Sequence, residues 1–252
     1  MTEFTASYKM EPKIKIFKDL EELTGYLMSR IQRQMLNKSS GQYYSIALSG
    51  GSTPKAIFKI IIEKYRTKID WSRIAFFWGD ERCVAPSDSE SNYHMTYQNL
   101  FRHLNLQELN FCRINGEDEP EGEAIRYAER VDFMLPHFNG IPQFDLIILG
   151  LGEDGHTASI FPENISLFYS DKLFETSQHP VTGQKRITAT GKLINNAKEV
   201  CFLATGISKA EKVAQILEKS DDWDTLPASL VNPAQGKLVW LLDKAAGAEL
   251  LM

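Results

Sequence analysis

Cysteine is scarce in this sequence, and long apolar runs are absent. The chain of 252 residues has only Cys83, Cys112 and Cys201, an odd number at wide spacing with no Cys-x-x-Cys pair. This pattern argues against a disulfide framework or a cysteine metal site and is typical of a reduced, intracellular protein. No stretch approaches the roughly 18 apolar residues of a membrane helix, and the N-terminus has no apolar signal core. We therefore expect a cytoplasmic protein with no membrane partner.

An excess of positive charge is also missing. Lys and Arg number 28 against 33 Asp and Glu, which gives a net charge of −5. Nucleic-acid-binding domains usually carry the opposite balance, so we expect no nucleic-acid partner. An anionic small molecule would have to be held by a local group of donors.

What the sequence does contain is a regular alternation of strand and helix patterns. Strands are predicted at 13–17, 44–48, 74–78, 144–149, 198–204 and 237–242, and helices at 20–35 (capped by Asp19), 54–65, 123–135 and 208–219, with one more after Ser91. This alternation predicts an α/β fold with a mostly parallel sheet and helices on both faces. Residues 13–252 are expected to form a single domain after a loose tail at residues 1–12. The acidic run 116–123 is predicted to be a solvated surface loop.

The loop Ser-Gly-Gly-Ser-Thr-Pro-Lys, residues 49–55, follows the second predicted strand. Thr53 is a good N-cap and Pro54 a favourable first helical residue, so a helix is predicted to begin there. Free amides at a helix start bind phosphate. The predicted phosphate donors are the backbone amides of Gly50, Gly51, Ser52 and Thr53, with the hydroxyls of the last two. A plain strand-to-helix turn is the alternative.

A second helix start at residues 205–211 supports a phosphate site. Ser208 and Glu211 fit a capping box. Lys209 would lie at the first helical position, where a cation opposes the helix dipole, so its placement indicates a nearby anion. Arg186 could bind the same anion in bidentate fashion. A solvated lysine and an ordinary surface arginine are the alternative.

The run 150–162, Gly-Leu-Gly-Glu-Asp-Gly-His-Thr-Ala-Ser-Ile-Phe-Pro, contains the dinucleotide pattern G-x-G-x-x-G. We reject that interpretation, because Glu153 and Asp154 would put carboxylates beside a pyrophosphate. Pro162 also prevents a long helix from following the loop directly.

The same loop presents His156 at the end of a predicted buried strand. Histidine titrates nearest neutrality, and one held there can take a proton from water as a general base. A lone histidine is more often structural, but its position between a glycine loop and the run Thr157-Ala158-Ser159 favours catalysis. The other histidines lie outside any glycine-built loop: His94, His103, His137 and His179.

A third polar cluster, Gly79-Asp80-Glu81-Arg82, follows the strand at 74–78. Two acids and an arginine at a strand end could orient a sugar, steer the histidine or stabilise developing negative charge. A surface salt-bridge cluster is the alternative.

Five segments together resemble the 6-phosphogluconolactonases, a branch of the family that also contains the glucosamine-6-phosphate deaminases. They are SGGSTPK, WGDERCVAPSDSESNYHM, LGLGEDGHTASIFP, KRITAT and TGISKAEKV, in the expected order over nearly the whole chain. The resemblance implies a modified Rossmann-like α/β domain with no metal and no cofactor. It also implies hydrolysis of 6-phosphogluconolactone to 6-phosphogluconate in the pentose phosphate pathway.

In the mechanism that this resemblance suggests, His156 deprotonates the attacking water. Either Asp154 or Asp80 orients its imidazole, and Arg82 or backbone amides stabilise the oxyanion. The substrate phosphate is held by the two helix starts with Arg186 and Lys209.

Two positions depart from the deaminase branch. Arg82 stands where the deaminases have tyrosine, and Phe161 where they have a glutamate needed for ring opening and proton transfer. A deaminase is therefore the disfavoured alternative. A non-catalytic sugar-phosphate sensor is the other, although the chain has no spare length for a signalling segment. The oligomeric state is expected to be a monomer or a homodimer.

Overall fold

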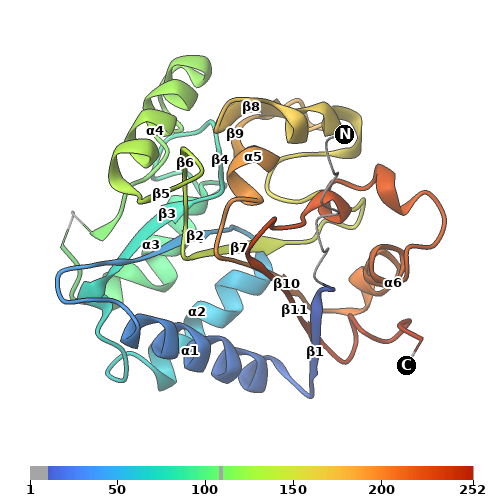
Figure 1. Cartoon of the computed structure of the whole chain (residues 1–252), viewed down its shortest axis with the longest axis horizontal. Coiled ribbons are helices and arrows are strands. Elements are labelled where there is room, and N and C mark those ends of the chain that lie inside the picture. Colours follow the sequence, from blue (N-terminus) through green and yellow to red (C-terminus); the bar gives the residue numbers. More distant parts are fainter. Residues whose placement is uncertain (1–10, 108–109, 252) are drawn as a thin grey trace, which may run out of the picture.

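The computed structural model describes residues 11–107 and 110–251, and its centre is a six-stranded sheet (Figure 1). The strand order is β1-β11-β10-β7-β2-β3, and every pairing is parallel. The strands are β1 (Lys13–Phe17), β2 (Tyr44–Leu48), β3 (Ile74–Trp78), β7 (Leu146–Gly150), β10 (Glu199–Ala204) and β11 (Lys237–Asp243). All residues of β2, β3 and β10 are buried, as expected for parallel strands covered on both faces. The predicted α/β fold is confirmed.

Helices cover both faces of this sheet. They are α1 (Leu20–Leu36), α2 (Ser52–Lys64), α3 (Asn92–Asn99), α4 (Pro120–Met134), α5 (Gly191–Ile194) and α6 (Ala210–Glu218). In Figure 1, α1 and α2 lie below the sheet, and α4 and α5 lie above it. Helix α1 begins where predicted, because Asp19 accepts a hydrogen bond from the Glu22 amide at 2.9 Å.

A second, antiparallel sheet was not predicted. It has the order β4-β9-β8, with β4 (Asp80–Arg82), β8 (Phe174–Gln178) and β9 (Lys185–Ala189). A small hairpin joins β5 (His137–Phe138) to β6 (Ile141–Pro142). This three-stranded sheet was not predicted because its strands are short and rich in polar residues, so no apolar run indicates them. It places β4 directly after β3, with only Gly79 between them.

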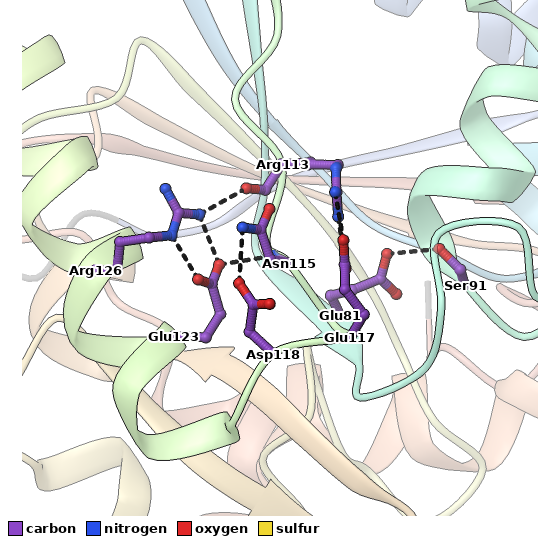
Figure 2. Close-up of polar contacts among 8 residues, drawn as sticks. All are labelled: Glu81, Ser91, Arg113, Asn115, Glu117, Asp118, Glu123 and Arg126. Atoms are coloured by element: carbon purple, nitrogen blue, oxygen red, sulfur yellow. Dashed lines mark hydrogen bonds and ion pairs between the residues drawn. The ribbon is translucent and has the colours of Figure 1, made fainter.

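The solvated-loop prediction for residues 116–123 is wrong in its second half. Helix α4 begins at Pro120, with Glu119 as its N-cap. Proline is favourable there because the first helical N–H has no partner within the helix. Glu123 is only 1% exposed and accepts hydrogen bonds from the Asn115 amide (2.6 Å) and the Arg126 guanidinium (2.7 Å) (Figure 2).

The buried apolar side chains form one cluster that extends along the chain from Phe17 to Ala246. Most of the predicted N-terminal tail, residues 1–10, lies outside the described residues. The single-domain boundary at residue 13 stays a prediction. Within the described ranges, no helix is both long and apolar enough to cross a membrane.

Candidate active site

A cavity of about 500 Å³ lies at the carboxyl ends of β2, β7 and β10, where ligands bind in open parallel sheets. Residues from the predicted loops after β2, β3, β7 and β10 line this cavity. The lining includes every predicted site residue: Gly50, Gly51, Ser52, Thr53, Asp80, Arg82, Asp154, His156, Arg186 and Lys209. Among the other lining residues, Asn92, Ala158 and Thr205 were not predicted as site residues.

The first helix start differs in detail from the prediction. Helix α2 begins at Ser52 after Gly51, so Thr53 is not its N-cap and Pro54 is its third residue. Gly51 has φ of 105°, a conformation that favours glycine and turns the chain into the helix one residue earlier. Pro54 is tolerated because it still lies among the first four residues, whose N–H groups have no intrahelical acceptor.

The residues of this helix start, Ser52 and Thr53, line the cavity, and their role as phosphate donors stays a prediction. The first backbone bond into the helix runs from Lys55 N to Gly51 O, so the amides of Ser52 and Thr53 precede the intrahelical ladder. The Thr53 hydroxyl is hydrogen-bonded to the Thr205 hydroxyl at 2.7 Å. This contact joins the loop after β2 to the loop after β10, 152 residues later in the chain.

The capping box predicted at the second helix start is wrong. Residues Ile207–Lys209 form a single 3₁₀ turn, and α6 begins only at Ala210 without a side-chain cap. The turn follows Gly206, which has φ of 92° and whose N–H donates to both carboxylate oxygens of Asp243 at 3.0–3.1 Å. Lys209 therefore immediately precedes α6, with its Nζ 3.9 Å from Glu153 Oε1.

The histidine loop brings an acid and a base into direct contact. The Asp154 Oδ1 lies 2.6 Å from His156 Nδ1 and also accepts the His156 backbone N–H at 3.0 Å. Gly155 (φ 83°) makes this tight turn, and a Cβ on Gly152 would lie 2.1 Å from His156 Nδ1. Both glycines are thus required for loop geometry rather than for a nucleotide.

The charge of Asp154 fixes the tautomer of this histidine. Burial alone would raise the pKa of Asp154, but the hydrogen bond and charge of His156 lower that pKa to about 2. An ionised carboxylate only accepts, so the proton lies on His156 Nδ1 and the Nε2 lone pair is left to accept another. Asp80, the other candidate orienting group, instead accepts from the Ser159 hydroxyl at 2.7 Å.

Two arginines lie opposite each other on the neighbouring strands β4 and β9. The β4–β9 pairing sets Arg82 directly across from Arg186. Both Nε atoms are buried and have no hydrogen-bond partner among the described residues. Burial, together with the charge of Arg82, lowers the pKa of Arg186. Like charges at opposed strand positions are unfavourable unless an anion lies between them, so this pair is suited to bind one.

The surface salt-bridge alternative for the Asp80–Arg82 segment is wrong. Asp80 is only 5% exposed, and among the described residues none of the three makes an ion pair. The Arg82 guanidinium donates instead to the Glu90 carbonyl oxygen. Ser159, which is fully buried, joins this segment to Arg186 because its hydroxyl also accepts from the Arg186 Nη1 at 3.4 Å.

Phe161 separates His156 from a second histidine. Its buried ring has centroid distances of 4.7 Å to His156 and 5.0 Å to His179, and Arg186 lies 5.5 Å from the same ring. Burial and the charge of Arg186 lower the pKa of His179. His179 was not predicted as a site residue, because its place beside Phe161 depends on the unpredicted β8–β9 pairing.

No group of three or more His, Cys, Asp or Glu side chains is arranged to hold a metal ion within residues 11–107 and 110–251.

Comparison with known proteins gives a consistent result. The family described as glucosamine-6-phosphate isomerases/6-phosphogluconolactonase matches residues 18–240. The chain is 38% identical to a 6-phosphogluconolactonase of Treponema pallidum over 93% of this chain and 92% of that protein. It is 44% identical to one of Haemophilus influenzae over 80% and 85% of the two chains. A crystal structure of 6-phosphogluconolactonase from Leishmania guyanensis superposes with a TM-score of 0.84 at 26% identity, covering 96% of this chain and 100% of that one. The chain belongs to the family of glucosamine-6-phosphate isomerases and 6-phosphogluconolactonases.

Proposed function

We propose that this protein is a 6-phosphogluconolactonase, which hydrolyses 6-phosphogluconolactone to 6-phosphogluconate in the oxidative pentose phosphate pathway. The observation that carries the proposal is the 2.6 Å contact between His156 and Asp154 on the wall of a cavity rich in anion donors. Its relatives named as lactonases support the same activity. We further propose a cytoplasmic monomer or homodimer that acts on a small molecule and needs neither nucleic acid nor cofactor.

The chemistry requires one base and one site for negative charge. We assign the substrate phosphate to the α2 amides, the Thr53 hydroxyl and Lys209. His156 Nε2 takes a proton from water as the water oxygen bonds to C1 of the lactone. Arg82 stabilises the tetrahedral oxyanion, and the bond from C1 to the ring oxygen then breaks. Protonated His156 returns its proton to that departing oxygen, which leaves the open-chain acid.

Arg186 was predicted to bind the substrate phosphate together with Lys209. It lies opposite Arg82 by strand register, and its Nη1 donates to the Ser159 hydroxyl at 3.4 Å. We therefore propose that Arg186 and Arg82 act on the same anionic group of the substrate.

The phosphate assignment predicts the effect of Lys209→Ala. The apparent KM for the phosphorylated lactone should rise by the equivalent of about 1.5–3 kcal/mol, the range for hydrogen bonds to charged groups. Preference over a lactone without the phosphate should fall in parallel. Lys212→Ala is the matched control, since Lys212 lies three residues further along, in the first turn of α6, and pairs with Glu211 at 2.9 Å. An unchanged preference in Lys209→Ala would place the phosphate elsewhere.

A second prediction separates the two branches of the family. The protein should not convert glucosamine 6-phosphate to fructose 6-phosphate and ammonia, because that reaction needs a carboxylate relay and Phe161 is buried against the histidine. Lactone hydrolysis needs no such relay and should persist after treatment with EDTA. Acid release and ammonia release are measured on the same preparation. Ammonia release at a rate comparable to lactone hydrolysis would overturn the assignment.

A further inference from the structure

Glu81 is a buried carboxylate between two residues of the cavity wall. Successive residues of a strand point to opposite faces, so Glu81 lies behind the surface formed by Asp80 and Arg82 on β4. It is only 3% exposed and does not line the cavity. No role in the reaction proposed above uses it.

Four donors converge on this carboxylate. Oε1 accepts from the amides of Arg82 (2.8 Å) and Asn92 (2.7 Å). Oε2 accepts from the Tyr93 amide (2.8 Å) and from the Ser91 hydroxyl (2.9 Å), the contact drawn in Figure 2. Among the described residues no Lys, Arg or His makes an ion pair with it. Buried charges are tolerated only when paired or fully hydrogen-bonded, and here the donors replace a cation.

The donors belong to two segments that must be held in register. The Arg82 amide is part of β4, whereas the other three come from the cap and first turn of α3. Glu81 thus acts as a remote cap for α3, while Ser91 itself accepts from the next amide, that of His94, at 3.1 Å.

Asn92, in the first turn of α3, contacts both β4 and the glycine loop after β2 (residues 49–53). Its Nδ2 donates to the Asp80 carbonyl oxygen at 2.9 Å. Its Oδ1 lies so close to Gly50 that a Cβ there would be 1.7 Å away. Moving Asn92 would therefore disturb both the β4 wall and the glycine loop.

We propose that Glu81 is a positioning residue, which fixes the distance between Arg82 and the Gly50–Gly51 loop through the first turn of α3. The inference rests on the proposed function for its effect on lactone hydrolysis. Its effect on anion binding does not depend on that function. A shift of about 1 Å between binding groups can cost on the order of 10²-fold in catalysis, so a rigid connection matters here.

The test compares Glu81→Gln with Glu123→Gln. Glutamine keeps the shape of the side chain but turns one acceptor into a donor that faces two donors. Glu123 is an equally buried carboxylate on α4, away from the cavity, and Figure 2 shows both residues. For each variant the unfolding midpoint, kcat and KM for the phosphorylated lactone, and the Kd for inorganic phosphate are measured.

We expect Glu81→Gln to raise KM and the phosphate Kd at least tenfold in the folded protein. Glu123→Gln should lower stability while leaving both within twofold of wild type. In an Arg82→Lys background, Glu81→Gln should have a smaller effect on kcat/KM, because both changes act through the position of Arg82. If Glu81→Gln does not fold, Ser91→Ala, which removes one of the four donors, should shift both constants about threefold in the same direction.

Loss of stability in Glu81→Gln with unchanged KM and phosphate Kd would overturn the proposal, as would an unchanged pair of constants in Ser91→Ala. Failure of the wild-type protein to hydrolyse the lactone would reject the proposed function instead. In that case the phosphate Kd alone still decides the role of Glu81.

Discussion

Replacing His156 by asparagine is expected to remove at least about 99% of lactonase turnover, because a general base contributes about 10²-fold or more. Asparagine cannot accept a proton from water at neutral pH. The phosphate Kd should stay near that of wild type, since the phosphate is assigned to the α2 amides and Lys209. Turnover is measured by timing acid release from freshly made lactone, with spontaneous hydrolysis subtracted.

His137→Asn is the matched control for this change. His137 also contacts an aspartate, Asp132, at 2.9 Å, but on an exposed surface away from the cavity. It should retain full turnover. More than about a tenth of wild-type turnover in His156→Asn would remove His156 from the role of base.

Replacing Asp154 by asparagine is expected to lower kcat by about 10²-fold. The carboxylate holds the proton on His156 Nδ1, whereas the amide group of asparagine could donate to Nδ1 and leave the proton on Nε2. That tautomer has no lone pair facing the water. A changed tautomer affects the chemical step, so KM should change much less than kcat.

The pH dependence gives an independent check on Asp154. Its pKa of about 2 means that the carboxylate stays ionised across the working range. Any fall in wild-type kcat/KM between pH 8 and pH 5 must then come from another group. Asp132→Asn, which removes the surface Asp–His pair, should leave the profile unchanged.

A wild-type level of kcat in Asp154→Asn would show that the imidazole is oriented without this carboxylate.

Much of the fold could be read from local sequence patterns. Five of the six parallel strands are mainly apolar runs, and β1 alternates lysine with apolar residues. Helix α1 carries both its cap at Asp19 and buried side chains at helical spacing. Such signals are local, because burial on both faces and helix capping each depend on residues a few positions apart. The position of the candidate site followed from the same patterns, since the carboxyl ends of parallel strands meet at one edge of the sheet.

Other features depended on contacts that no local pattern contains. From the sequence, either Asp80 or Asp154 could contact His156. In the structure Asp154 makes this contact, because the turn at Gly155 brings the carboxylate back to the imidazole ring. Helix starts shifted at Ser52 and Ala210 because positive-φ glycines before them redirect the chain.

The sequence by itself determined an α/β protein with a parallel sheet and a glycine-built histidine loop, and it predicted a set of anion donors at one sheet edge. Only the tertiary structure placed Arg82 opposite Arg186 and joined Glu81 to the first turn of α3. The first contact depends on the register between the short polar strands β4 and β9. The second depends on the burial of the Glu81 carboxylate against α3. Register and burial are decided by the packing of the whole chain, so a single sequence gives no periodic signal for them.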